Sequence, residues 1–310
     1  MIKILMAKGR EIMIIDRLYE SVKNKGPVCV GLDTSINYIP KEFLNKYTSL
    51  EEALFKFNQR IIDATIDVSA CFKVQIAYYE ALGIKGLTAY KNTLEYIKYK
   101  GGIAIADVKR GDIKDTAAMY AKAHFTGDFE SDFVTLNPYM GLDTLEPYME
   151  YIKTGEKGVF LLIRTSNKGA EDIQYIENAH GEKVYNLVGY KINELGKKYI
   201  GKYGYSLIGG VVGCTHVDEA LKFRNNLENT FFLIPGYGAQ GGTCEDVALY
   251  LKDGNGGVVN SSRGILLAYK NKEGREMEFD LCAREEAIKI RDGIAKAVGG
   301  EKGEHKLYRK

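Results

Sequence analysis

A chain of 310 residues is long enough to bury a large core, either as two domains or as one large α/β barrel. Its hydrophobic content of 45% and its charged content of 27% are ordinary for a globular enzyme. The formal net charge of +2 excludes the broad electrostatic field that attracts nucleic acids or membrane surfaces, so we expect neither partner.

The N-terminal segment does not have the pattern of a signal peptide. Lys8, Arg10 and Glu11 interrupt the apolar run that such a peptide requires, and no run in the chain approaches transmembrane length. Met13 opens a stretch that would itself make a sensible start. We therefore expect residues 1–12 to be an extension, residues 13–298 to form one catalytic domain and residues 299–310 to be a polar tail.

Eight short apolar segments are predicted to be β-strands, and helical patterns separate them. The segments are rich in β-branched or aromatic residues and cover residues 28–31, 70–74, 103–106, 133–136, 159–163, 207–212, 231–234 and 258–259. Apolar side chains at helical spacing follow, for example at Leu54, Phe57, Ile61, Ala64 and Val68. In number and length these elements match a single α/β domain of the (β/α)8 TIM barrel class. An open doubly wound sheet is the alternative, although the GxGxxG turn that usually follows its first strand is absent.

The stretch from Asp107 to Asp112 places two carboxylates and a lysine directly after the third predicted strand. Asp107 and Lys109 are two residues apart, so on a strand their side chains face the same side. Asp112 follows a turn and is expected to open the next helix. Parallel α/β folds place their chemistry at the C-terminal ends of strands, which makes this cluster a candidate active site. A solvated loop with a surface ion pair is the alternative.

Two further features lie on or after other predicted strands. Lys73 lies inside an apolar strand, where a lysine is either paired or points outward with its stem over apolar surface. Glycine-rich turns follow the seventh strand, at 235–242, and the eighth, at 260–264, where Arg263 is included. Barrels bind phosphate at these two places through backbone N–H groups and a helix N-terminus, so we expect a phosphate site here.

Eight motifs occur in order along the chain. They are GLDTS at 31–35, FKVQIAYYE at 72–80, ADVKRGDIKDTA at 106–117, VTLNPYMG at 134–141, RTSNKGAE at 164–171, VVGCT at 211–215, PGYGAQGG at 235–242 and NSSRGI at 260–265. This ordered set resembles the orotidine 5′-phosphate decarboxylase family, in its longer bacterial type called subfamily 2, from about Asp16 to Val298. The chain departs from the family pattern at Lys168, where proline is more usual, and at Ser262, where shorter members carry glycine.

The resemblance implies that the chain decarboxylates orotidine 5′-phosphate to uridine 5′-phosphate (UMP) and CO2 in de novo pyrimidine biosynthesis, without a cofactor. Lys109 corresponds to the lysine that protonates C6 of the pyrimidine, and Asp107 to the aspartate beside the departing carboxylate. Lys73 and Asp112 complete an alternating Lys-Asp-Lys-Asp array. The resemblance also implies a homodimer in which Asp112 reaches the active site of the partner subunit.

Five substrate-binding residues are implied in the same way. Asp33 and Thr116 correspond to ribose-binding positions, with Thr116 again contributed across the dimer interface. Ser166 corresponds to the serine that reads the pyrimidine edge, and Gln240 and Arg263 to the pair that grips the phosphate.

The expected chemistry fits these residue types. Decarboxylation leaves electron density on C6, and a lysine ammonium can both stabilise that charge and protonate it. Five cysteines and four histidines are scattered without a metal-binding pattern, so we expect no metal and no cofactor. The odd number and wide spacing of the cysteines also predict reduced thiols and a cytoplasmic protein.

Two other functions remain as alternatives. A metal-dependent sugar-phosphate enzyme on the same barrel would need a carboxylate near the second strand to hold Mg²⁺, where this chain has Lys73. A non-enzymatic sensor of a phosphate ligand would be expected to have lost the charged array, all of which is present.

Overall fold

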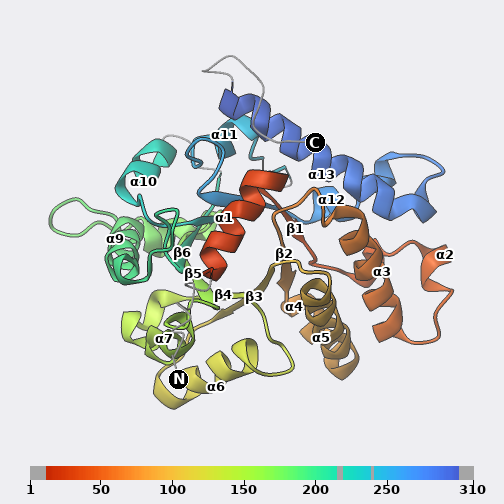
Figure 1. Cartoon of the computed structure of the whole chain (residues 1–310), viewed down its shortest axis with the longest axis horizontal. Coiled ribbons are helices and arrows are strands. Elements are labelled where there is room, and N and C mark those ends of the chain that lie inside the picture. The colour runs from red at the N-terminus through yellow and green to blue at the C-terminus, as the bar shows by residue number, and fades with distance from the viewer. Residues whose placement is uncertain (1–11, 215–218, 239–240, 300–310) are drawn as a thin grey trace, which may run out of the picture.

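Eight parallel strands close into a barrel in a computed structural model that describes residues 12–214, 219–238 and 241–299 (Figure 1). The strands pair in chain order, and β1 pairs with β8 to close the cylinder. Their bounds are β1 Val28–Gly31, β2 Cys71–Gln75, β3 Ala104–Arg110, β4 Phe133–Leu136, β5 Gly158–Arg164, β6 Ile208–Val212, β7 Phe232–Ile234 and β8 Gly257–Ser261. The predicted barrel is confirmed, and the open doubly wound sheet is wrong.

Most of the helices surround the barrel and connect its strands, whereas the first helix precedes β1 and the last follows β8 (Figure 1). The longer ones are α1 Ile14–Lys25, α3 Leu50–Thr65, α5 Gly83–Tyr99, α6 Lys114–Phe125, α7 Glu146–Ile152, α9 Val184–Gly196, α10 Ala220–Asn226 and α13 Phe279–Gly299. The short ones are α2 Lys41–Leu44, α4 Ala77–Glu80, α8 Glu171–Gln174, α11 Cys244–Ala248 and α12 Arg263–Leu266. Within the described ranges, no helix has the length and apolar character needed to cross a bilayer.

Helix α3 shows how the apolar stripe in the sequence builds the outer layer. The Ser49 side chain caps its first turn by accepting a backbone N–H. Phe57 is fully buried and stacks on Phe279 of α13, with 4.6 Å between the ring centroids. The helix ends at Thr65, so Val68, which we expected on the same helical stripe, is instead buried in the turn before β2.

Inside the barrel, below the C-terminal ends of the strands, aromatic rings lie against glycines of the next strand. The rings of Phe133 on β4 and Phe160 on β5 are 5.2 Å apart. A Cβ atom at Gly158 would lie 2.4 Å from the Phe133 ring, and one at Gly209 would lie 2.6 Å from the Phe160 ring. Glycine at these positions therefore makes room for a close-packed layer. Two residues after Phe133 on the same face of β4, Thr135 lines the cavity described below, so this layer forms the floor of the site.

Polar residues before the last helix form a surface cluster on the outside of the barrel. Arg275 pairs with Glu278 at 2.7 Å and with Glu285 of α13 at 3.1 Å, and Lys272 also pairs with Glu285. Exposed pairs of this kind contribute little stability individually. The predicted extension and tail lie outside the described residues except for Ile12 and Gly299, and Gly299 is the last residue of α13.

Candidate active site

A cavity of about 550 Å³ lies at the C-terminal ends of the barrel strands. The predicted site residues that line it are Asp33, Lys73, Asp107, Lys109, Ser166 and Arg263. They come from the ends of β1, β2, β3, β5 and β8, so the closed barrel brings together residues that are far apart in sequence. Gln240 lies outside the described residues. Asp112 and Thr116 are not among the described residues that line the cavity.

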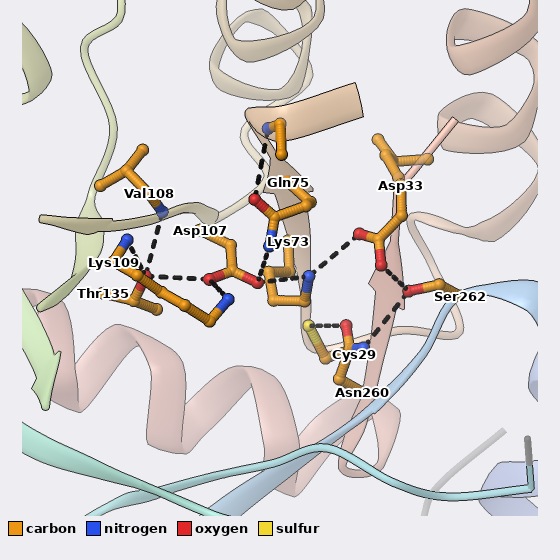
Figure 2. A network of polar contacts seen from close by, with 12 residues as sticks. Cys29, Asp33, Lys73, Gln75, Asp107, Val108, Lys109, Thr135, Asn260 and Ser262 are labelled. Atoms are coloured by element: carbon orange, nitrogen blue, oxygen red, sulfur yellow. Dashed lines mark hydrogen bonds and ion pairs between the residues drawn. The ribbon is translucent and has the colours of Figure 1, made fainter. Parts of the chain in front are cut away.

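Four charged side chains that line this cavity alternate in sign (Figure 2). Lys73 Nζ lies 3.0 Å from Asp33 Oδ1 and 2.9 Å from Asp107 Oδ2, and Lys109 Nζ lies 2.6 Å from Asp107 Oδ1. The Lys73 side chain is only 5% exposed, so the alternative in which it points outward is wrong. Within one chain the contacts run in the order Asp33, Lys73, Asp107, Lys109. Asp33, which the sequence predicted only as a ribose-binding residue, is therefore also a member of the charged array.

The two central members of the array stabilise each other as ions. Burial alone would raise the pKa of Asp107, but the ammonium groups of Lys73 and Lys109 outweigh it and hold that pKa well below its usual range. Burial alone would lower the pKa of Lys73, but Asp107 and Asp33 outweigh it and raise that pKa above its usual value. Asp107 and Lys73 are therefore both charged at neutral pH, deep in the cavity.

Lys109 contacts Asp107 from an irregular part of β3. Its φ is +44°, in the left-handed region that residues with a Cβ rarely adopt. The pairing of β3 with β4 shifts register between Ala106 and Arg110, so Lys109 lies in an irregular part of the strand. The prediction that the two side chains meet is confirmed by their ion pair, but the reason is this irregularity and not simple strand alternation.

Sequence reasoning missed three polar residues that hold the array in place. Gln75 Nε2 donates to Asp107 Oδ2 at 3.0 Å, and Ser262 Oγ donates to Asp33 Oδ2 at 2.9 Å. Thr135 Oγ1 donates to Asp107 Oδ1 at 2.9 Å. The available signal was weak: Gln75 follows Lys73 at the two-residue spacing of one strand face, and Ser262 directly precedes a predicted phosphate ligand.

Asp112 and Thr116 lie on the segment that leads from β3 into α6. Asp112 is half-buried, and its Oδ1 accepts the N–H of Ile113 at 2.8 Å, whereas Thr116 is exposed. Helix α6 begins at Lys114, so the expected helix start at Asp112 is two residues early. Within the described part of this single chain, neither side chain forms a hydrogen bond or ion pair with Lys109.

The turns after β7 and β8 form one wall of the cavity. Gly236 and Gly238 have φ values of +103° and +67°, which explains the glycines of the first turn. Arg263 begins α12 directly after β8 and is exposed. Its guanidinium forms no hydrogen bond or ion pair with another described residue, so it is available to an anionic group. This wall has the position and the charge that the predicted phosphate site requires.

Comparisons with known proteins point to one family. Residues 26–277 match the family described as Orotidine 5'-phosphate decarboxylase / HUMPS family. The chain is 66% identical over 286 residues to the orotidine 5′-phosphate decarboxylase of Clostridium perfringens strain 13, which covers 92% of this chain and 99% of the relative. It is also 66% identical over 286 residues to the Clostridium acetobutylicum enzyme, covering 92% of this chain and 100% of the relative. The structure of Leishmania donovani OMP decarboxylase is similar with a TM-score of 0.69 and 28% identity, covering 91% of this chain and 100% of that chain.

Proposed function

The chain belongs to the orotidine 5′-phosphate decarboxylase family and converts orotidine 5′-phosphate to UMP and CO2 in pyrimidine biosynthesis, and from this premise we propose that Lys109 donates the proton that replaces the carboxylate at C6. The observation that carries the proposal is the 2.6 Å ion pair between Lys109 Nζ and Asp107 Oδ1 inside the cavity. The predicted family, fold and reaction are confirmed, and the residue roles below are proposals.

The proposed proton transfer balances the electrons of the reaction. The bond between C6 and the carboxylate carbon breaks, its electron pair stays on C6, and CO2 leaves. The ring delocalises this pair poorly, so a positive charge beside C6 stabilises the transition state. The Lys109 ammonium supplies that charge and then gives one proton to C6. Because the Lys109 side chain is 44% exposed, the resulting amine can recover a proton from solvent.

Asp107 and Lys73 prepare Lys109 for this step. Asp107 Oδ1 accepts a hydrogen bond from the Lys109 ammonium at 2.6 Å and so directs that ammonium. Lys73 binds the other oxygen of Asp107, which fixes the carboxylate between two cations. In the substrate complex, Asp107 lies beside the carboxylate that departs.

The remaining residues of the cavity bind the parts of the substrate that do not react. We assign Asp33 to the ribose hydroxyls, Ser166 to the pyrimidine edge, and Arg263 together with Gln240 to the phosphate. The described members of this set line the same cavity, and Arg263 is a cation without a described partner. Binding energy from the remote phosphate can be used to stabilise the transition state at C6.

The array also favours a reaction without metal or cofactor. A metal-dependent sugar-phosphate enzyme would coordinate its metal with carboxylates at the ends of these strands. Here the Lys73 ammonium lies between Asp33 and Asp107, 3.0 Å and 2.9 Å away, where it pairs with both carboxylates. The intact array equally disfavours a non-catalytic sensor, which has no need for a buried cation between two anions.

We place the enzyme in the cytoplasm because of its thiols. All five cysteines are free, and four of them are buried. Free thiols of this kind are typical of a reducing compartment.

We further propose that the enzyme is a homodimer, because large apolar side chains are exposed on neighbouring elements. Ile113 and Met119 at α6 are 47% and 62% exposed, and Tyr139 and Met140 on the turn Pro138–Met140 are 78% and 51% exposed. Helix α6 and this turn both contact the turn Leu142–Leu145. Exposed apolar side chains on elements that meet at one turn are typical of a subunit interface.

In this dimer, Asp112 and Thr116 act in the active site of the partner subunit. Both lie at the start of α6 next to the exposed Ile113, and neither lines the described cavity of its own chain. Asp112 would add a second carboxylate to Lys109, and Thr116 would contact the ribose.

Mixing two inactive variants tests whether the site is shared between subunits. Lys109→Ala and Asp112→Asn are each expected to lose most of kcat. In a mixed dimer, one of the two sites combines the intact Lys109 of one chain with the intact Asp112 of the other. Denaturing and refolding the two variants together in equal amounts should therefore restore about a quarter of the parental activity, because about half of the dimers are mixed.

The control is each variant refolded alone, which should stay inactive. If the mixture stays as inactive as the separate variants while size-exclusion chromatography shows mixed dimers, Asp112 acts in its own chain and the shared site is wrong.

A further inference from the structure

Thr135 on β4 carries a hydroxyl that contacts both Lys109, the proposed proton donor, and Asp107, the carboxylate paired with it. Its Oγ1 accepts the backbone N–H of Val108 at 3.0 Å and that of Lys109 at 2.9 Å, and it donates to Asp107 Oδ1 at 2.9 Å (Figure 2). The residue is 1% exposed. Neither the motifs nor the proposed function gives this residue a role.

The chemistry of the partners fixes the direction of all three hydrogen bonds. A backbone N–H can only donate, and the ionised Asp107 can only accept. The Thr135 hydroxyl must therefore accept twice and donate once, which uses its whole capacity. No other arrangement satisfies two backbone N–H groups and a carboxylate oxygen with a single hydroxyl.

The backbone at Lys109 needs such a partner because β3 departs from regular pairing there. Between its last two paired positions β3 advances four residues while β4 advances two, so Val108 and Lys109 lie in a bulge. Their N–H groups bond to the Thr135 side chain. Lys109 also has a φ of +44°, a conformation that persists only where the surroundings hold it.

We propose that Thr135 is a positioning residue that sets the place of the Lys109 ammonium relative to C6, an inference that rests on the proposed role of Lys109. Through the two N–H groups it fixes the backbone from which the Lys109 side chain starts. Through its own proton it fixes the carboxylate to which Lys109 is paired. Asp107 Oδ1 accepts from Thr135 and Lys109, and Oδ2 accepts from Lys73 and Gln75, so the carboxylate cannot rotate without losing a donor.

Two substitutions separate the hydroxyl of Thr135 from its shape. Thr135→Val keeps the shape and removes the hydroxyl, whereas Thr135→Ser keeps the hydroxyl and removes the methyl group. We expect Thr135→Val to lower kcat at least about tenfold while the Kd of UMP stays within about threefold, because small displacements of a reacting group are costly. Thr135→Ser should keep kcat within about threefold of the parent. Thr135→Ala also removes the hydroxyl and gives the same readout if the valine variant does not fold.

A matched control makes the same chemical change away from the array. Thr65 is fully buried in α3, where its Oγ1 donates to the carbonyl of Ile61 at 2.7 Å. Thr65→Val should lose stability and leave kcat unchanged. This control separates loss of a buried hydroxyl in general from loss of the one that holds Lys109.

The Lys109→Ala background shows whether Thr135 acts through Lys109. There, Thr135→Val should cause no further fall in the residual kcat, and a further tenfold fall would contradict the inference. A folded Thr135→Val enzyme with kcat within threefold of the parent would also overturn it, as would a serine variant as slow as the valine variant. If Lys109→Ala keeps parental kcat, the proposed role of Lys109 fails, which is a different result from any of these.

Discussion

Lys109→Ala is expected to lower kcat by at least about a hundredfold while the enzyme still binds UMP. The ammonium acts on charge that develops at C6 during the reaction, so its loss falls mainly on the transition state. Removing it also leaves Asp107 less neutralised, so a modest change in the affinity for an anionic ligand is expected. The loss of substrate absorbance gives kcat, and calorimetric titration gives the Kd of UMP.

The control for this substitution is Lys153→Ala, which removes an exposed lysine at the end of α7. It should leave both kcat and the Kd of UMP unchanged. If Lys109→Ala turns over within about tenfold of the parent, another group protonates C6 and the assignment of Lys109 is wrong.

Arg263→Ala is expected to lower kcat/KM at least about tenfold without changing the proton donor. Arg263 is exposed on the cavity wall after β8, and a charge-assisted contact with phosphate is worth roughly 1.5–3 kcal/mol. If phosphate binding contributes to transition-state stabilisation, kcat should fall as well as affinity. Steady-state kinetics with orotidine 5′-phosphate measures both quantities.

The same variant assayed with orotidine, which lacks the phosphate, provides the internal control. Its turnover of this truncated substrate should be almost the same as that of the parent. If Arg263→Ala impairs both substrates equally, Arg263 supports the structure of the loop and the phosphate assignment is wrong.

The strands were predictable because buried parallel strands are short, apolar and β-branched, and this pattern does not depend on distant residues. The bounds of β4 coincide with the predicted residues 133–136. The largest errors are at the functional ends: β3 extends to Arg110 and β8 to Ser261, beyond the predicted ends at 106 and 259. A hydrophobic pattern ends at the first polar side chains. In a barrel, however, the last residues of a strand face the cavity and are polar, so the strand continues beyond the apolar segment.

The part of the site that could be predicted is the part where a charged residue lies in a segment expected to be buried. Lys73 inside an apolar strand required partners, and the structure supplies Asp33 and Asp107. Thr135 was not predictable, because its role depends on a bulge in β3 and on pairing between two strands that no local pattern reveals. The role proposed for Asp112 requires a second chain, so neither sequence spacing nor one barrel can place it against Lys109.

The central claim is that this array decarboxylates orotidine 5′-phosphate with its own side chains. The most direct test is to follow UMP formation by the purified enzyme after extensive treatment with a chelator, with and without added Mg²⁺. We expect the same kcat in all conditions, because the Lys109 ammonium, held by Asp107, supplies the positive charge that a metal would otherwise provide. Activity that the chelator abolishes and Mg²⁺ restores would contradict the claim.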